Sequence, residues 1–369
     1  MISCQSTVEF ADKGVIINKI GREKVMNMEL KLNSVLKPLG ILAAAGIVFM
    51  AIRFVGFIVG PLVLAVLFVA VLRPMYSAMM RRQFPRGIAV LLTVIVFILI
   101  IGFVAWVFAL AITQTVSIAQ QYAPEITGKF SDLNTTLSQL PSYASGLSGL
   151  LKSVDPTAIS GFLTGFIGAL SDFISKIVII FFLFLFTLTG GPVVMKNMRE
   201  EFGDAHQLTK KTVSFLDSLA KYFILRTLVN AVTGVGIALT CLLMGIPNAL
   251  VWGLLTFILS YIPYIGMFIA CVPPGLIAFA EGGVTALGIF VVLCVIINGL
   301  AEQVVSPIVT GRGLSISPFL IFISFIFWGW YLGPIGFIVA VPMTLMVLLF
   351  MYSFEETRGI AKLFSNIPH

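Results

Sequence analysis

Long apolar runs follow one another along the chain and predict membrane-spanning helices. A helix needs roughly 20 apolar residues to cross about 30 Å of hydrocarbon. The runs lie at 39–58, 59–72, 88–112, 173–189, 223–244, 248–280, 284–300 and 318–352. Only Gly60-Pro61 separates the first two runs, and the second is so short that we expect its helix to continue through Tyr76–Met80. The pattern predicts an all-α, polytopic integral membrane protein with about seven or eight membrane segments.

The composition excludes a soluble enzyme. Hydrophobic residues make up 59% of the chain and charged residues 11%, whereas soluble domains have about 45–50% apolar and about 25% charged residues. Such a chain has too little polar surface to cover a globule that faces water. Because the sequence also lacks a phosphate-binding loop of the G-x-x-x-x-G-K-[ST] type, we expect no ATPase within it and no enzymatic activity.

Cysteine, histidine and net charge give no sign of a metal, a cofactor or nucleic acid. The four cysteines form no C-x-x-C pair, and the chain has two histidines. We therefore predict no disulfide framework, no metal site and no cofactor. The net charge of +7 comes from basic anchors beside the membrane runs, so it gives no reason to expect a nucleic acid partner.

The distribution of lysine and arginine predicts the orientation in the membrane. The stretch 73–86 has four arginines, 191–222 has five basic residues, and 113–172 has only Lys129 and Lys152. Since basic loops stay in the cytoplasm, we expect 73–86, 191–222 and both termini inside, and 113–172 outside.

These runs and loops divide the chain into five regions. We predict a cytoplasmic N-terminal segment at 1–38, first membrane spans at 39–112, an extracytoplasmic helical segment at 113–172, a transport membrane region at 173–352, and a cytoplasmic tail at 353–369. The native start could be Met1, Met26 or Met28, and the sequence leaves that choice open.

The outward segment has a helical stripe. Apolar residues recur in steps of three and four from Val116 to Val154, which predicts helix, and Pro141 should divide it into two helices. One interpretation is that both helices pack on the membrane domain. The other is that they form a contact between subunits.

The C-terminal half contains an internal repeat with an offset of 70 residues. Tyr261, Ile265, Gly266 and Ala270 recur as Tyr331, Ile335, Gly336 and Ala340. Each copy lies in the middle of a long apolar run, with proline and glycine where a helix would have to stay regular. Backbone freed in this way is tolerated in a membrane only where it is buried or lines a cavity.

The repeat predicts two broken helices or re-entrant hairpins, in 248–280 and 318–352. Full spans are the alternative, but they would place Arg312 outside, so the positive-inside rule favours hairpins. Two similar hairpins that enter from opposite faces follow the inverted-repeat design of secondary transporters. We therefore expect the substrate site near the midplane, where the two breaks meet.

Polar and aromatic side chains inside these runs are the candidates for function. Polar residues in spans bond neighbouring helices or contact a substrate, and the aromatic residues near the breaks are membrane-interface anchors or line a pocket. Arg226 could pair with Asp217 or Glu302. The candidate substrate-binding or gating residues are Asn230, Tyr261, Pro263, Tyr264, Gly266, Asn298, Glu302, Trp330, Tyr331, Gly333, Pro334 and Gly336.

Three long motifs in this half resemble the autoinducer-2 exporter family. They are the stretch 245–266 with Pro273-Pro274 behind it, the stretch 307–318 with its Gly311-Arg312-Gly313-Leu314 core, and the stretch 327–342 that opens with Phe-Trp-Gly-Trp. The match covers nearly the whole chain from about residue 35, and its C-terminal motifs are the most specific part.

The resemblance implies a bacterial inner-membrane permease and a homo-oligomer, a pentamer. Some members are described as exporters of the quorum-sensing signal autoinducer-2 and others as sodium–proton antiporters. We expect a secondary exporter of a small polar molecule, autoinducer-2 being the candidate, with sodium(lithium)–proton antiport as the alternative. The expected partners are the lipid bilayer and a small polar solute or cation. An antiporter generally needs a carboxylate in the membrane, and Glu302 is the best placed.

Overall fold

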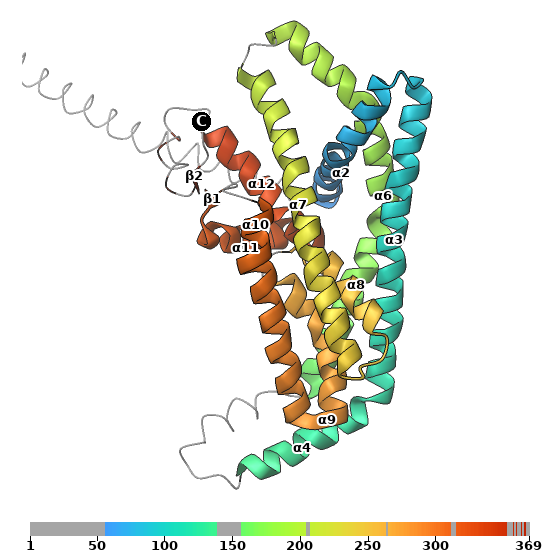
Figure 1. Ribbon diagram of the computed structural model, residues 1–369, viewed down its shortest axis with the longest axis vertical. Coiled ribbons are helices and arrows are strands. Elements are labelled where there is room, and N and C mark those ends of the chain that lie inside the picture. Colours follow the sequence, from blue (N-terminus) through green and yellow to red (C-terminus); the bar gives the residue numbers. More distant parts are fainter. Residues whose placement is uncertain are drawn as a thin grey trace, which may run out of the picture. The chain divides into compact units, whose positions relative to one another are not determined.

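The computed structural model describes residues 56–138, 156–203, 207–262, 265–310 and 315–352, with a few positions beyond. These residues are almost entirely helical (Figure 1), which confirms the all-α prediction. Some of the predicted features lie outside the described residues: the segment 1–38, most of the first apolar run, the break at Pro141, the loop arginine Arg312, and Pro263 and Tyr264.

The helices form a series of spans and shorter apolar pieces. In chain order they are α2 (Gly56–Arg81), α3 (Arg86–Gln121), α4 (Ala123–Ser138), α6 (Pro156–Phe202), α7 (Gln207–Leu243), α8 (Ala249–Leu259), α9 (Gly266–Gly299), a π-helix (Leu300–Val305), α10 (Ser306–Thr310), α11 (Pro318–Leu332) and α12 (Pro334–Met351). Five stretches are long and apolar enough to cross a membrane, and α8, α11 and most of α12 are shorter apolar helices. This confirms a polytopic membrane protein.

Helix α2 continues through Pro61 and Pro74 to Arg81. The boundary expected at Gly60-Pro61 is therefore absent, and the predicted continuation through Tyr76–Met80 is confirmed. A proline inside a membrane helix is tolerated when neighbouring segments pack on the disturbed turn. Gly60 lies in such a contact, because a methyl group there would be 3.5 Å from Ile335.

Helices α3 and α6 lie antiparallel and define the two ends of the bundle. The ring of Phe97 stacks on Phe184 at 3.9 Å, and Phe108 meets Phe173 at 5.3 Å, so later residues of α3 pair with earlier residues of α6. The start of α3 and the end of α6 thus share one end, which we call the basic end. Helix α6 has 47 residues, a length of about 70 Å, and projects well beyond a hydrocarbon core.

At the opposite end, α4 packs on α9. Ile126 of α4 forms a buried cluster with Phe279 and Ala280, and Phe130 packs against it. The predicted stripe is helical here and contacts the membrane domain, as the first interpretation expects. The contact between subunits stays an expectation.

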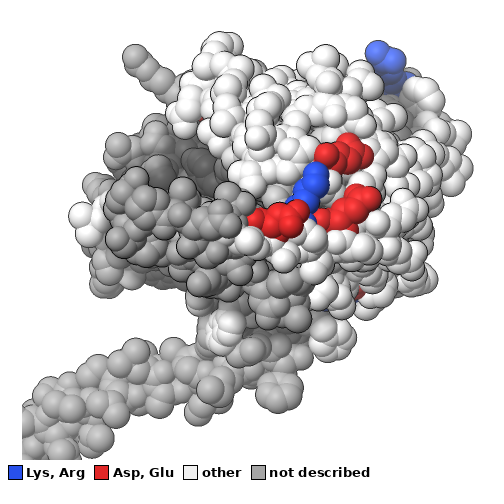
Figure 2. All heavy atoms as spheres, turned by 90° about the horizontal axis from the view of Figure 1, so that it is seen from below, with Lys and Arg blue, Asp and Glu red and all other residues white. Residues whose placement is uncertain are grey.

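The end of the bundle that carries α4 is acidic among the described residues. Glu125 and Asp132 flank Lys129 on α4, and the exposed Glu281 of α9 accepts a hydrogen bond of 3.2 Å from the Tyr122 hydroxyl. Figure 2 shows acidic side chains gathered around a basic one when the molecule is viewed from below. We call this end the acidic end.

Residues 248–282 form a re-entrant hairpin, which we call hairpin 1. Its first leg, α8, follows Asn248, whose side-chain amide donates to the Gln114 side chain at 2.6 Å near the acidic end. The second leg begins at Gly266 and returns to Glu281 at that same end. Since both legs open on one end of the bundle, the predicted hairpin is confirmed.

Helix α9 reverses direction at Gly283. This residue has φ 68° and ψ −156°, a conformation that only glycine adopts readily. The sulfur atoms of Cys271 and Cys294 lie 3.6 Å apart, and Gly275 packs against Phe290, so the two halves run antiparallel. The second half, with the π-helix and α10, returns the chain from the acidic end, as the run 284–300 predicted.

The α11 and α12 helices form hairpin 2, residues 318–351. Its turn is at Gly333, with φ 69°. The Trp328 indole donates to the Thr344 hydroxyl at 3.0 Å across the two legs. Before α11, Ser315–Ile316 (β1) pairs antiparallel with Ser365–Asn366 (β2) of the tail. The described residues thus contain five stretches long and apolar enough to cross a membrane, the last of which includes the second leg of hairpin 1, and two hairpins.

Candidate functional site

The tip of hairpin 1 is a break that glycine makes possible. Helix α8 ends at Leu259 and is followed by Ser260, whose N–H donates to Thr256 O at 2.9 Å, and the Gly266 N–H donates to Ile262 O at 2.9 Å. A methyl group at Gly266 would overlap the carbonyl oxygen of Leu259. The second leg can therefore approach the end of α8 only because residue 266 has no side chain.

The tip of hairpin 2 repeats this construction. A methyl group at Gly336 would overlap the carbonyl oxygen of Trp328, and the Gly336 N–H donates to Gly333 O at 2.8 Å. Pro334 begins α12, where its fixed φ suits a first helical turn. The two glycines that the 70-residue offset equates thus occupy equivalent positions.

A buried ion pair fastens the tip of hairpin 1. Arg226 on α7 donates to both oxygens of Glu302, at 2.7 and 3.0 Å. The same guanidinium donates to the carbonyl oxygen of Ser260 at 3.0 and 3.3 Å. The side chains are only 9% and 12% exposed, and the cation lies at the C-terminal end of α8, where the helix dipole favours it. We call this group the Arg226 lock.

Glu302 reaches the lock from the π-helix. Such widened turns are rare and occur frequently at functional sites. Asn298, half-buried, lies one turn earlier on α9. The interpretation that Arg226 pairs with Glu302 is confirmed, while Asp217 instead pairs with Arg73 at 2.9 Å.

A second contact joins α7 to the same tip. The hydroxyl groups of Thr227 and Tyr261 lie 2.6 Å apart, and the Tyr261 ring stacks on Phe223 at 5.7 Å. Arg226 and Thr227 are adjacent on α7, and Ser260 and Tyr261 are adjacent on the tip. Arg226 thus bonds Ser260 and Thr227 bonds Tyr261, and these two bonds fix the register of α7 relative to the tip.

Three buried polar atoms near this contact have no hydrogen-bond partner among the described residues. They are the Nδ2 and Oδ1 atoms of Asn230 and the Oγ atom of Ser260. Asn230 is fully buried, with no exposed surface, and Ser260 is 4% exposed. Because the large majority of buried polar side-chain atoms are paired in native structures, such atoms need a specific explanation.

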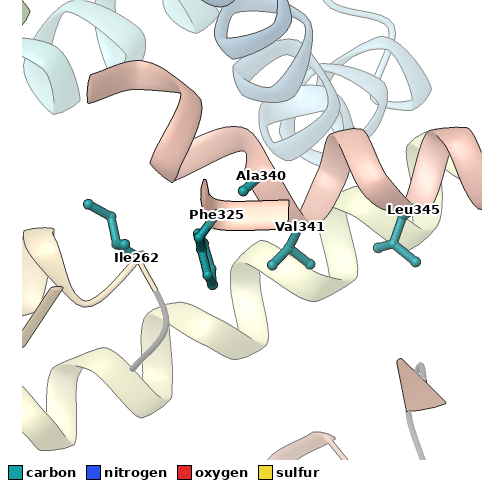
Figure 3. Packing of buried hydrophobic residues seen from close by; sticks show 5 residues of the cluster. All are labelled: Ile262, Phe325, Ala340, Val341 and Leu345. Carbon is teal, nitrogen blue, oxygen red and sulfur yellow. The ribbon is translucent and has the colours of Figure 1, made fainter. Parts of the chain in front are cut away.

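The two hairpins meet through an apolar cluster. Figure 3 shows Ile262, from the tip of hairpin 1, beside Phe325 of α11, with Val341 and Leu345 on α12. The tip of hairpin 1 therefore packs against the legs of hairpin 2, more than one helical turn from Gly333. We expected the two breaks themselves to meet; Ile262 and Ile265 of the first break pack on this cluster together with Phe337, which follows Gly336 of the second, and a direct contact between the breaks stays a prediction.

Comparison with known proteins places this sequence among transporters. A family model described as "AI-2E family transporter" matches residues 39–355. The chain belongs to the AI-2E transporter family.

Relatives of this transporter cover nearly its full length. The "AI-2 transport protein TqsA" of Escherichia coli (strain K12) is 27% identical over 321 residues, 87% of this chain and 93% of that protein. The "Putative transport protein YhhT" of the same strain is 28% identical over 322 residues, 87% of this chain and 91% of that protein. "Putative transport protein YueF" of Bacillus subtilis (strain 168) is 24% identical over 327 residues, 81% of this chain and 85% of that protein.

The transporter brings some candidate residues together and separates others. Tyr261, Gly266 and Glu302 lie at or beside the Arg226 lock. Gly333, Pro334 and Gly336 form the tip of hairpin 2. Tyr331 is buried and stacks on Phe327, whereas the Trp330 side chain is 56% exposed on the outer face of α11.

The sequence interpretation missed Ser260. Its neighbour Tyr261 was selected because the repeat contains it, but Ser260 has no counterpart of its kind at position 330. A signal was nevertheless present: Ser260 is the last polar residue before the break, where α8 leaves a free carbonyl for a donor such as Arg226.

Proposed function

We propose that this transporter exports a small polar molecule across the bacterial inner membrane, with autoinducer-2 as the first substrate to test. The observation that carries this proposal is the pair of hairpins, the first of which brings a group of mostly uncharged polar side chains together inside the bundle. Secondary transporters place their substrate sites at such broken helices. The relative that is named as an AI-2 transport protein supports the choice of substrate.

The geometry does not favour cation–proton antiport. Such a mechanism needs a membrane carboxylate that binds and releases a proton. Both oxygens of Glu302 accept hydrogen bonds from Arg226, so both are already engaged in the buried ion pair. Releasing that pair would leave two buried charges uncompensated.

Reconstitution into liposomes tests the proposal. Liposomes that contain the purified transporter are loaded with autoinducer-2, and its efflux is followed with and without imposed sodium or proton gradients. We expect efflux that saturates with concentration and exceeds that of protein-free liposomes. Efflux no faster than in protein-free liposomes for autoinducer-2 and for a panel of other small polar solutes would contradict the proposal.

Sidedness is part of the same proposal. The basic end carries Arg81, Arg82 and Arg86, whereas the acidic end carries Glu125 and Glu281, so the positive-inside rule puts the acidic end outside. Single cysteines at positions 138 and 209, in intact cells, test this with a reagent that does not cross membranes. We expect labelling at 138 and not at 209, and the reverse result would contradict the orientation.

The homo-oligomer, a pentamer, is also proposed. It rests on the family resemblance, and the exposed apolar side chains of α7 and α9 are equally suited to lipid or to a second subunit. Native mass spectrometry of the protein in detergent would give the number of copies directly.

A further inference from the structure

Helix α7 places Asn230 against the last turns of α8. Arg226, Asn230 and Gly234 are spaced four residues apart, so they share one face of α7. Arg226 binds the carbonyl of Ser260, and a methyl group at Gly234 would be 2.8 Å from Gly253 O and from the Phe257 side chain. Asn230 therefore lies between two close contacts of α7 with α8, about 6 Å along the helix from Arg226.

The surroundings of Asn230 are polar but carry no net charge. Arg226 and Glu302 compensate each other, and the hydroxyls of Thr227 and Tyr261 are bonded together. These four groups already have partners. The Asn230 amide and the Ser260 hydroxyl, which have no partner among the described residues, can both donate and accept hydrogen bonds.

We propose that the Asn230 amide and the Ser260 hydroxyl are solute-contacting groups at the closed tip of hairpin 1, and that the neighbouring Arg226–Glu302 pair keeps this site neutral, so that it accepts uncharged solutes. The assignment rests on the proposed function and adds to it the contact residues and the charge class of the solute. A solute with adjacent hydroxyl or carbonyl groups matches the donors and acceptors of both side chains. An ion entering the site would lose its hydration without meeting an opposite charge that is free.

The first test separates a solute-binding role from a structural one. Asn230→Leu keeps the number and branching of the side-chain heavy atoms and removes two polar atoms that have no partner among the described residues. The thermal unfolding midpoint of the solute-free protein in detergent should therefore rise, by about 1–2 °C. An asparagine that bonds its neighbours for stability would give a lower midpoint when replaced, and a lower midpoint would overturn the assignment. Thr240→Val is the matched control on α7, because Thr240 is buried and donates to Gly236 O at 3.0 Å.

The second test measures transport in liposomes with four probes. They are autoinducer-2, ribose, the anion ribonate and the cation 1-amino-1-deoxyribitol, the last three being matched in size. We expect the wild type to move the neutral probes faster than the charged ones. Asn230→Leu and Ser260→Ala should each lower neutral transport by about tenfold or more, as the loss of a buried hydrogen bond predicts, while Thr240→Val keeps the wild-type rate.

The outcomes distinguish the two proposals. A transporting wild type whose Asn230→Leu and Ser260→Ala variants work at the same rate overturns the assignment and leaves the proposed function standing. Equal transport of ribose and ribonate by the wild type overturns the charge selection. A wild type that moves none of the four probes contradicts the proposed function, and this assignment fails with it.

Discussion

Hairpin 1 and hairpin 2 share a sequence pattern, but their polar contacts differ. In hairpin 1 the tip bonds residues of other elements, with Ser260 held by Arg226 of α7. In hairpin 2 the polar groups bond one another, since Trp328 donates to Thr344 and Thr344 donates to Ser324 at 2.7 Å. The repeated sequence thus determines the backbone break in each hairpin, whereas the neighbouring helices determine which polar contacts the hairpin makes.

The two hairpins also differ in how far their apolar side chains are buried. In α8, Trp252, Leu255 and Ile258 are buried against protein, whereas Phe319 and Trp330 of α11 are more than half exposed. An exposed apolar face on a membrane helix suits lipid. Hairpin 1 is therefore enclosed by its own bundle, and hairpin 2 has one leg with an outer surface.

The largest effect is expected from the glycines that make both tips possible. Gly266→Ala and Gly336→Ala each put a methyl group onto a backbone carbonyl oxygen, which side-chain motion cannot relieve. We expect each to destabilise the protein by the order of 4–5 kcal/mol, seen as loss of the monodisperse peak in fluorescence-detected size exclusion.

Gly288→Ala is the control for these variants, because nothing lies within 4 Å of a methyl group there. Alanine favours helix over glycine by about 0.5–1 kcal/mol, so this variant should be as stable as the wild type or more so. If only one of the two tip variants were disruptive, the two glycines would not be equivalent.

The next largest effect is expected from the ion pair that holds the tip of hairpin 1 to other elements, a contact that hairpin 2 lacks among the described residues. Arg226→Gln removes one partner of a buried pair and leaves Glu302 charged and uncompensated, a loss of about 3–5 kcal/mol. Arg73→Gln is the control, because the Arg73 and Asp217 side chains are 39% and 66% exposed, and such pairs contribute about 0–1 kcal/mol. Thermal unfolding in detergent measures both.

Glu302→Gln tests what the carboxylate does. The amide keeps an acceptor for Arg226 but cannot titrate, so an exporter should retain measurable transport, lowered several-fold to about a hundredfold. The double variant Arg226→Gln with Glu302→Gln should be more stable than Arg226→Gln alone. Complete loss of proton movement in Glu302→Gln liposomes, from a wild type that exchanges protons for sodium, would instead support antiport.

A smaller effect is expected inside hairpin 2. Thr344→Val leaves the Trp328 indole without its acceptor and Ser324 without its donor, at a cost of about 1–3 kcal/mol. Because the bonds of these groups among the described residues lie within the hairpin, the solute preference measured in liposomes should stay the same. A changed preference would show that hairpin 2 also contacts the solute.

The smallest effect is expected at the acidic end. Tyr122→Phe removes the hydrogen bond to the exposed Glu281 carboxylate, worth less than about 1 kcal/mol. Burial, and then the bond to Glu281, raise the pKa of Tyr122 above 10.0. The contribution is therefore present below pH 10.0 and is lost as the pH rises through the folded-state pKa, and unfolding curves at pH 8 and pH 11 compare the two conditions.

The sequence predicted those features of the fold that depend on a short stretch of residues alone. Glycine and proline must interrupt helices, so the breaks at 261–266 and 331–336 were predictable. In the structure α8 ends at Leu259, α9 begins at Gly266, and α11 and α12 meet at Gly333. A charge inside a span needs a partner, which reduced the choice for Arg226 to two residues. The spacing of apolar runs predicted the order of the described membrane segments from α2 onward.

The sequence did not predict those features that depend on how two segments far apart in the chain pack together. The π-helix depends on how Glu302 reaches Arg226 and has no pattern of its own. The outward position of Trp330 depends on which face of α11 meets α12. The contact of Ile262 with the cluster on hairpin 2 depends on the lengths of both hairpins, which composition and spacing leave undetermined.

The π-helix also has a consequence for the connection between the hairpins. Compared with an α-helix, a widened turn contains one more residue, and each residue advances an α-helix by about 100°. The rotational phase of Ser306–Thr310, the last helical residues before hairpin 2, is therefore set at Leu300–Val305, where Glu302 joins the Arg226 lock. Tightening this turn to regular α-helix would rotate Glu302 and α10 relative to each other by about 100°. The six residues of the π-helix thus set the rotation of α10, which leads to hairpin 2, relative to the Arg226 lock, which holds hairpin 1.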